Sequence, residues 1–152
     1  MKSILLETIR KELQASFDRQ ARAAIDAHAA ATDPGSKAEG KYDTRSLEAS
    51  YLATGQARQV EELAAAVRLF EGWTMPDFTA DEPIRMGALV EGDMSGETVF
   101  LLLVPAAGGM ILNLDGQEIT LLTPASRLYQ ALIGRRVGDY LEGFELLVLE
   151  VS

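Results

Sequence analysis

The residues best suited to chemistry lie in one short polar segment, Asp33 to Arg45, with the sequence DPGSKAEGKYDTR. Carboxylate oxygens are the ligands that Mg²⁺ prefers, and this ion often takes only one or two protein carboxylates. A Mg²⁺ ion shared with a partner can orient or activate water for phosphodiester cleavage. The segment therefore predicts a shared metal site at its three acids, which alternate with basic residues. The acids are Asp33, Glu39 and Asp43, and the basic residues are Lys37, Lys41 and Arg45. The simpler alternative is a solvated turn whose mixed charges oppose aggregation.

Other catalytic chemistries find little support in the sequence. The chain has no cysteine and a single histidine, His28, which excludes Cys-ligated zinc, disulfides and His-rich metal sites and disfavours a Ser-His-Asp triad. Glycine-rich phosphate loops and HExxH motifs are absent as well. We expect the protein to be no enzyme in its own right and to hold no cofactor of its own, apart from Mg²⁺ shared with a partner.

Two long helices are predicted to carry the polar segment at their far end. Residues 3–31 contain no Gly or Pro and are rich in good helix formers. Asp33-Pro34-Gly35 then breaks the helix, and a second helical stretch follows over residues 42–70. Each helix would be about 43 Å long, and the short connection makes them antiparallel.

Apolar stripes on the two helices predict one register for the pair. In an antiparallel pair, facing residues keep a constant sum of residue numbers, and Leu13 with Leu63 obeys the same sum as Gln20 with Gln56. The register places large side chains at the base, alanines towards the polar segment and a glutamine layer between them, which can fix register at some cost in stability. We expect a projecting coiled-coil hairpin, with a bundle element as the alternative. The stripes are Leu6, Ile9, Leu13, Phe17, Gln20, Ala24 and Ala27 on the first helix, and Ala49, Ala53, Gln56, Val60, Leu63, Val67 and Phe70 on the second.

The second half of the chain changes to a strand pattern. Short segments rich in Val, Leu and Ile are bounded by Gly, Pro and Asp, and Asp115-Gly116 signals a tight hairpin between two of them. Thr123-Pro124 is predicted to open a helix that stops at Gly134. The expected fold class is α+β, with a small antiparallel sheet and one helix in this half. The predicted strands are GALVEGD, ETVFLLLVP, MILNL, EITLL and FELLVLEV.

Charge is distributed unevenly in a chain of net charge −9. Residues 77–152 hold four arginines against twelve acids, so this half repels phosphates and predicts no sequence-specific DNA binding. An acidic domain beside a near-neutral helical arm favours a protein partner with a basic surface, although solubility alone would also account for the charge. The sequence has no apolar run of membrane-spanning length and no secretory signal, so the expected location is cytoplasmic, without membrane contact.

Two segments of the chain resemble the Gre family of transcription elongation factors. The first is KAEGKYDTRSLEASYLATGQARQVEEL, which is similar to the family's hairpin tip, and the second is TPASRLYQALIGRRVGDYLEG, Thr123 to Gly143, which is similar to its C-terminal signature. The resemblance covers nearly the full chain. It implies a coiled-coil hairpin over residues 1–73, a linker over 74–79 and an FKBP-like domain over 80–152 that docks on RNA polymerase.

The resemblance also implies a mechanism. The hairpin would enter the secondary channel of RNA polymerase, near the RNA 3′ end, while the end domain holds the channel rim. In cleavage-competent members, two tip acids help to hold the second Mg²⁺ and position a water, so that the polymerase cuts its own backtracked RNA. The residues expected to contact the polymerase or the RNA are Lys37, Lys41, Tyr42, Arg45, Arg127, Arg135 and Arg136.

The tip departs from the family's pattern at the two acidic positions. Aligned on Tyr42, Ala38 and Gly35 stand where the catalytic acids are expected, with Glu39 one residue from the first position and Asp33 two from the second. Cleavage stimulation and a non-cleaving role that regulates transcription or competes for the channel, as Rnk-like relatives suggest, are therefore both open.

Two alternative functions do not involve RNA polymerase. An FKBP-like prolyl isomerase or chaperone would need an aromatic pocket, for which the C-terminal half offers Phe100, Tyr129, Tyr140 and Phe144, with Trp73 in the linker region. A coiled-coil adaptor with no polymerase link is the other alternative.

Overall fold

The computed structural model describes residues 1–32 and 45–152, and the side chains outside residues 31–54. Two long helices, α1 (Lys2–Thr32) and α2 (Arg45–Gly72), precede a mixed sheet of six strands, which confirms the α+β class. The chain divides into two compact units. We call Arg10–Gly72 the helical unit, and Met1–Ile9 with Trp73–Ser152 the sheet unit. None of the helices among the described residues combines the length and apolarity that spanning a membrane needs.

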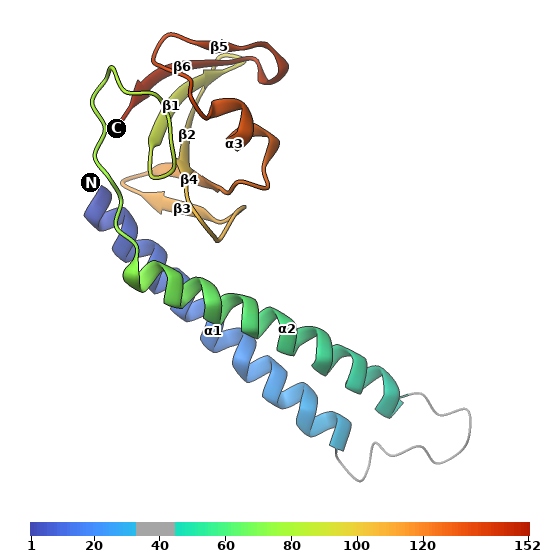
Figure 1. Ribbon diagram of the computed structural model, residues 1–152. Coiled ribbons are helices and arrows are strands. Elements are labelled where there is room, and N and C mark those ends of the chain that lie inside the picture. The colour runs from blue at the N-terminus through green and yellow to red at the C-terminus, as the bar shows by residue number, and fades with distance from the viewer. Residues whose placement is uncertain (33–44) are drawn as a thin grey trace. The chain divides into compact units, whose positions relative to one another are not determined.

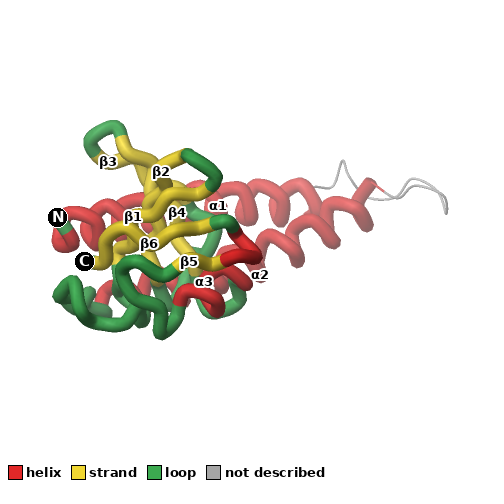
Figure 2. Tube along the Cα trace, turned by 90° about the horizontal axis from the view of Figure 1, so that it is seen from above, coloured by secondary structure: helices red, strands yellow, loops and turns green. Residues whose placement is uncertain are grey.

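In the helical unit, α1 and α2 lie side by side and run in opposite directions (Figures 1 and 2). Near the end of α2, the Arg10 Nε donates to the backbone oxygen of Phe70 at 2.8 Å. Leu13 is 1% exposed and Ala66 is buried, whereas Phe17, Gln20, Ala24 and Ala27 are only partly buried. The pair is thus more tightly buried at this end. The coiled-coil geometry of the seam stays a prediction.

The sheet unit is built on strands in the spatial order β3-β4-β2-β1-β6-β5. The strands match the five predicted segments, with one addition, the short β5. Their bounds are β1 Leu89–Met94, β2 Glu97–Leu103, β3 Ile111–Leu114, β4 Gln117–Leu122, β5 Tyr140–Leu141 and β6 Leu146–Val151.

The prediction of a purely antiparallel sheet is wrong, because β2 pairs with β4 in parallel. Sequential strands usually neighbour one another, and that rule places β3 beside β2. Instead β3 lies at the edge, and the hairpin at Asp115-Gly116, both with positive φ, returns β4 into the space between β3 and β2. After two reversals, β4 runs in the same direction as β2.

One face of the sheet carries the main core of this unit, against α3 (Arg127–Leu132). Leu103 and Leu146 from the strands are fully buried there, together with Leu132 and the nearly buried Tyr129 from α3. Gly92 lets β6 approach β1, because a Cβ at this position would lie 2.5 Å from the Leu146 Cδ1. The opposite face buries leucines on β2, β3 and β4, but its side chains on β5 and β6 are exposed.

The helix in the sheet unit begins later than predicted. Ser126, not Thr123, is its N-cap, since the Ser126 side chain accepts a hydrogen bond from the Tyr129 backbone N–H at 3.4 Å. Pro124 therefore lies in the preceding turn, where Ser126 N–H bonds to the Thr123 carbonyl. The predicted stop at Gly134 is confirmed, because the helix ends at Leu132 and Gly134 adopts a φ of +82°.

Candidate functional site

Most of the predicted tip site lies outside the described residues. This holds for the predicted metal ligands Asp33, Glu39 and Asp43 and for the predicted contacts Lys37, Lys41 and Tyr42. Arg45 is the first residue of α2, but its side chain is not described. In residues 1–32 and 45–152, no group of three or more acids and histidines is arranged to hold a metal. The shared Mg²⁺ site stays a prediction from the sequence.

The remaining predicted contacts, Arg127, Arg135 and Arg136, are all exposed in the sheet unit. Backbone pairing brings two of them to a loop that contains another arginine. Ile84 N–H donates to the Arg135 carbonyl at 2.7 Å, and Gly134 N–H donates to the Ile84 carbonyl at 2.8 Å. Because Ile84 is 1% exposed, its side chain anchors this crossing in the core. Arg85, the next residue, therefore belongs to the same surface, which we call the arginine loops (residues 79–86 and 134–139).

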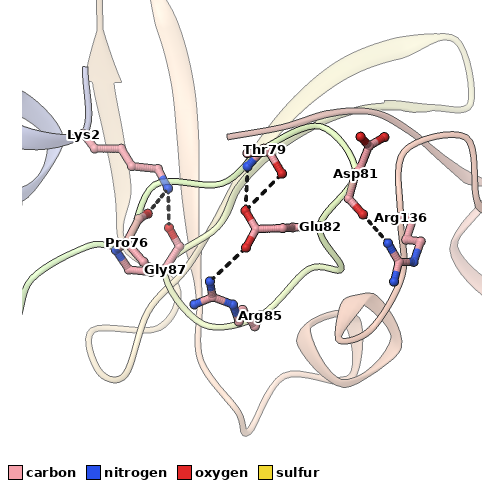
Figure 3. A network of polar contacts seen from close by, with 8 residues as sticks. All are labelled: Lys2, Pro76, Thr79, Asp81, Glu82, Arg85, Gly87 and Arg136. Atoms are coloured by element: carbon pink, nitrogen blue, oxygen red, sulfur yellow. Dashed lines mark hydrogen bonds and ion pairs between the residues drawn. The ribbon is translucent and has the colours of Figure 1, made fainter.

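The second arginine loop is held by several polar contacts. The Arg136 guanidinium donates to the Asp81 carbonyl (Figure 3). The Arg136 backbone N–H donates to the Asp139 Oδ2 at 2.8 Å. The neighbouring Arg135 donates from its Nε to the Ala131 carbonyl on α3 at 3.4 Å. These bonds restrict the loop that carries the two arginines, so less conformational entropy is lost when they meet a partner.

The first loop is closed by Glu82. Its Oε2 accepts from the Thr79 backbone N–H at 2.7 Å, and its Oε1 lies 3.3 Å from the Arg85 guanidinium (Figure 3). The Thr79 backbone hydrogen bond, with a smaller contribution from Arg85, lowers the pKa of Glu82. Arg85 also lies 4.5 Å from the centre of the Phe78 ring. The loop therefore holds Arg85 between a carboxylate and an aromatic face.

Lys2, at the start of α1, completes the network within the sheet unit. Its Nζ donates to the carbonyls of Pro76 at 2.5 Å and Gly87 at 2.9 Å (Figure 3). The same nitrogen lies 4.5 Å from the Phe78 ring centre. Burial lowers the pKa of Lys2 to about 8, while Asp77 opposes this shift and Arg85 adds to it. Lys2 thus ties residues 1–9 to the loop that carries Arg85.

The arginine loops gather three of the four basic residues of 77–152, beside the acids Asp81, Glu82 and Asp139. Sequence reasoning found Arg135 and Arg136 but missed Arg85 and Lys2. Arg85 had one available signal, since it is one of only four basic residues in 77–152. The backbone hydrogen bonds of Ile84 bring Arg85 close to Arg135 and Arg136. These bonds depend on tertiary structure and cannot be predicted from the spacing of residues in the sequence.

The aromatic residues proposed for an isomerase pocket are not gathered on one surface. Tyr129 is 7% exposed in the core between α3 and the sheet, and Phe144 packs against that core. Phe100 instead lines a pocket on the opposite face of the sheet, and Tyr140 is 53% exposed. This arrangement offers no common aromatic surface for a proline.

Comparison with known proteins leaves the family open. No family model matches the chain, and no curated protein matches it in sequence. Solved structures that resemble it include the GreA factor homolog 1 (Gfh1) protein of Thermus thermophilus, at 18% identity and a TM-score of 0.38 over 94% of each chain. The Thermus aquaticus Gfh1 is 17% identical, with a TM-score of 0.35 over 93% of this chain and 92% of that one. A structure described as the transcription factor Gfh1 is 18% identical, with a TM-score of 0.39 over 95% and 94%. These TM-scores are too low to establish a shared fold.

Proposed function

We propose that this protein is a Gre-type regulator of transcription elongation that binds RNA polymerase. The observation that carries the proposal is the Thr123 to Gly143 segment, which resembles the family's C-terminal signature. In the structure this segment runs through the capped helix α3 and the loop pinned to Ile84 and Asp81. Its exposed arginines are Arg127, Arg135 and Arg136, and with Arg85 they suit an acidic surface on the polymerase.

The helical unit supplies the reach that the proposed mechanism needs. With 31 and 28 residues, α1 and α2 are roughly 42–46 Å long at 1.5 Å per residue. Both helices end next to the Asp33 to Arg45 segment, so a hairpin of this kind would deliver its acids and basic residues deep into a channel. We infer an FKBP-like docking domain and a coiled-coil probe on the same grounds.

The tip sequence favours a regulator that occupies the channel over a cleavage factor. Ala38 and Gly35 lack carboxylates at the positions where the family's pattern has acids. If cleavage is stimulated, Asp33, Glu39 and Asp43 are the candidate ligands for Mg²⁺ shared with the polymerase, which would supply an activated water. The protein would in either case modulate the polymerase's own activity.

A backtracked elongation complex with purified core polymerase tests the proposal. The full chain is expected to change the rate of RNA cleavage or of pause escape at stoichiometric concentration. Replacing Asp33, Glu39 and Asp43 together by Ala should leave binding intact and alter only this rate. If the full chain neither binds the polymerase nor changes either rate, the proposed function is wrong, and the coiled-coil adaptor becomes the better explanation.

A further inference from the structure

The outer face of the sheet, opposite α3, differs between its two halves. On β5 and β6 it exposes three large apolar side chains: Tyr140 at 53%, Leu147 at 37% and Leu149 at 43%. On the same strands, the alternate residues Leu141, Leu146 and Val148 are at most 4% exposed and belong to the core. The exposed side chains therefore project from the face of the sheet that lies away from this core. Tyr140 pairs directly with Leu147 across the two strands, so at least these two are neighbours.

Acidic residues lie beside this apolar strip on β1 and β6. Glu91 is directly opposite Glu150, and Asp93 is directly opposite Leu147. In the described part of the chain, the side chains of Glu91 and Glu150 make no hydrogen bond or ion pair, whereas the Asp93 Oδ1 accepts from the Gly96 N–H at 2.9 Å. Like charges directly opposite on paired strands are destabilising, so folding gains nothing from the Glu91–Glu150 arrangement.

A β-bulge between β1 and β6 exposes an additional side chain of β6. The register between β1 and β6 shifts between Glu91 and Gly92, so that Leu149 is left without a partner on β1. Both Leu149 and Glu150 are then exposed, while Val148 and Val151 on either side are buried. The bulge thus exposes two consecutive residues, one apolar and one acidic, side by side on the surface. Bulges often re-aim side chains in this way at functional positions.

A pocket of about 170 Å³ adjoins the two glutamates. Its lining includes Glu91, Glu150 and Phe100, and Phe100 is the cross-strand neighbour of Glu91 on β2. Two carboxylates and an aromatic ring suit the cationic end of an arginine or lysine side chain, which ion pairing and the ring face would both attract.

We propose that this face, defined by Glu91, Asp93, Tyr140, Leu147, Leu149 and Glu150, binds a basic amphipathic segment of a protein partner. The apolar side of the segment would cover Leu147, Leu149 and Tyr140, and a Lys or Arg beside it would enter the pocket between the glutamates. Charge complementarity selects this occupant, because the acids repel anionic lipid and nucleic acid. The proposal goes beyond the arginine loops, which lie on other segments and present three arginines, and it does not require that the partner is RNA polymerase.

Titration of the full-length ¹⁵N-labelled protein with two synthetic helical peptides tests this proposal. One peptide has a leucine stripe flanked by arginines, and the other has glutamates in place of the arginines. The arginine peptide is expected to bind, with amide shifts concentrated on β1, β5 and β6. The glutamate peptide should not bind.

Two double variants of acidic residues test whether binding depends on the position of the charges or only on the net charge of the protein. Glu91→Gln with Glu150→Gln should weaken the arginine peptide about tenfold, while Asp115→Asn with Glu118→Gln removes the same charge from the β3–β4 hairpin and should change affinity less than about twofold. Leu147→Ser with Leu149→Ser should weaken binding without changing the net charge. Equal losses in the two acid variants, amide shifts elsewhere, or self-association of the chain through this face in place of peptide binding would overturn the proposal. Failure to bind polymerase would leave these outcomes unchanged, so the two proposals fail independently.

Discussion

The two units of this protein are stabilised in different ways. The sheet unit has a continuous core in which Leu103, Leu132 and Leu146 are fully buried, and its loops are cross-linked by backbone pairing at Ile84. In the part of the helical unit whose side chains are described, burial is concentrated near Leu13, Ala66 and Phe70. The difference indicates a division of labour, in which the sheet unit offers fixed surfaces for recognition and the helical unit gains length at the expense of core.

A buried polar atom without a partner is a further difference between the helical unit and the sheet unit. Within the part of the chain that the structure describes, the Gln56 Oε1 is buried without a hydrogen-bond partner. Gln20 and Gln56 were predicted to share a polar layer, and both are partly buried, but this oxygen is not satisfied there. An unpaired buried acceptor lowers the free energy of unfolding by about 1–3 kcal/mol. This is a large loss for a pair of helices with few buried side chains.

The largest expected effect comes from opening the core of the sheet unit. Leu103→Ala should lower its free energy of unfolding by about 2–5 kcal/mol, because Leu103 is 0% exposed and a cavity would remain. Leu63→Ala, at a partly buried position in the helical unit, should cost clearly less. Urea denaturation followed by Trp73 fluorescence and by circular dichroism at 222 nm measures both. Equal losses would contradict the proposed difference between the units.

Two glycine substitutions should have opposite signs. Gly92→Ala places a Cβ 2.5 Å from the Leu146 Cδ1 and 3.0 Å from the Leu147 carbonyl, so we expect a loss of about 1–3 kcal/mol. Gly55→Ala, on an exposed part of α2 with nothing within 4 Å of the new Cβ, should stabilise the helical unit by about 0.5–1 kcal/mol. Thermal melts of the two variants check the signs. A stabilising Gly92→Ala would show that β1 and β6 are not closely packed.

Replacing the unsatisfied glutamine should stabilise the helical unit. Gln56→Leu removes the buried orphan oxygen and adds apolar contact, with an expected gain of about 1 kcal/mol. Gln59→Leu, at an exposed position on the same helix, is the matched control and should have little effect. The midpoint of urea unfolding followed at 222 nm distinguishes the two. Loss of stability in the first variant would mean that Gln56 has a partner in solution.

A pH dependence of stability is expected from Lys2. Its pKa is lowered from 10.5 to about 8 in the folded protein, chiefly by burial. Between pH 8 and 10.5 the unfolded chain therefore binds the proton more strongly, so the contribution of Lys2 to stability rises with pH over this interval. Below pH 8 both states hold the proton and the contribution is constant. The difference in free energy of unfolding between the wild type and Lys2→Met should thus increase from pH 7.5 to pH 10, and a decrease would contradict the lowered pKa.

Much of the fold could be predicted because its signals are local. The run over residues 3–31 without Gly or Pro corresponds to α1, which ends at Thr32, and Gly134 with its positive φ follows the end of α3 at Leu132. The parallel pairing of β2 with β4 could not be predicted, since it depends on where β3 lies in space. Short β5 was missed because two residues show no periodicity, and Ser126 displaced Thr123 as the cap because both residue types cap helices well.

The candidate site was predictable only in part, for the same reason. Arg135 and Arg136 were found through a linear motif, whereas Arg85 joins them through the Ile84 backbone and Lys2 through two carbonyls that lie more than seventy residues away. Those contacts are long-range, and no single-sequence pattern records them.

Equilibrium binding to purified core RNA polymerase decides whether this protein is a polymerase-binding regulator. We expect that the full chain binds, and that Arg135→Ala with Arg136→Ala weakens binding about tenfold or more, as truncation of charged interface residues commonly does. Arg68→Ala, an exposed arginine on α2, should change affinity far less. No binding by the wild type, or equal affinity for the arginine-loop variant, would contradict this expectation.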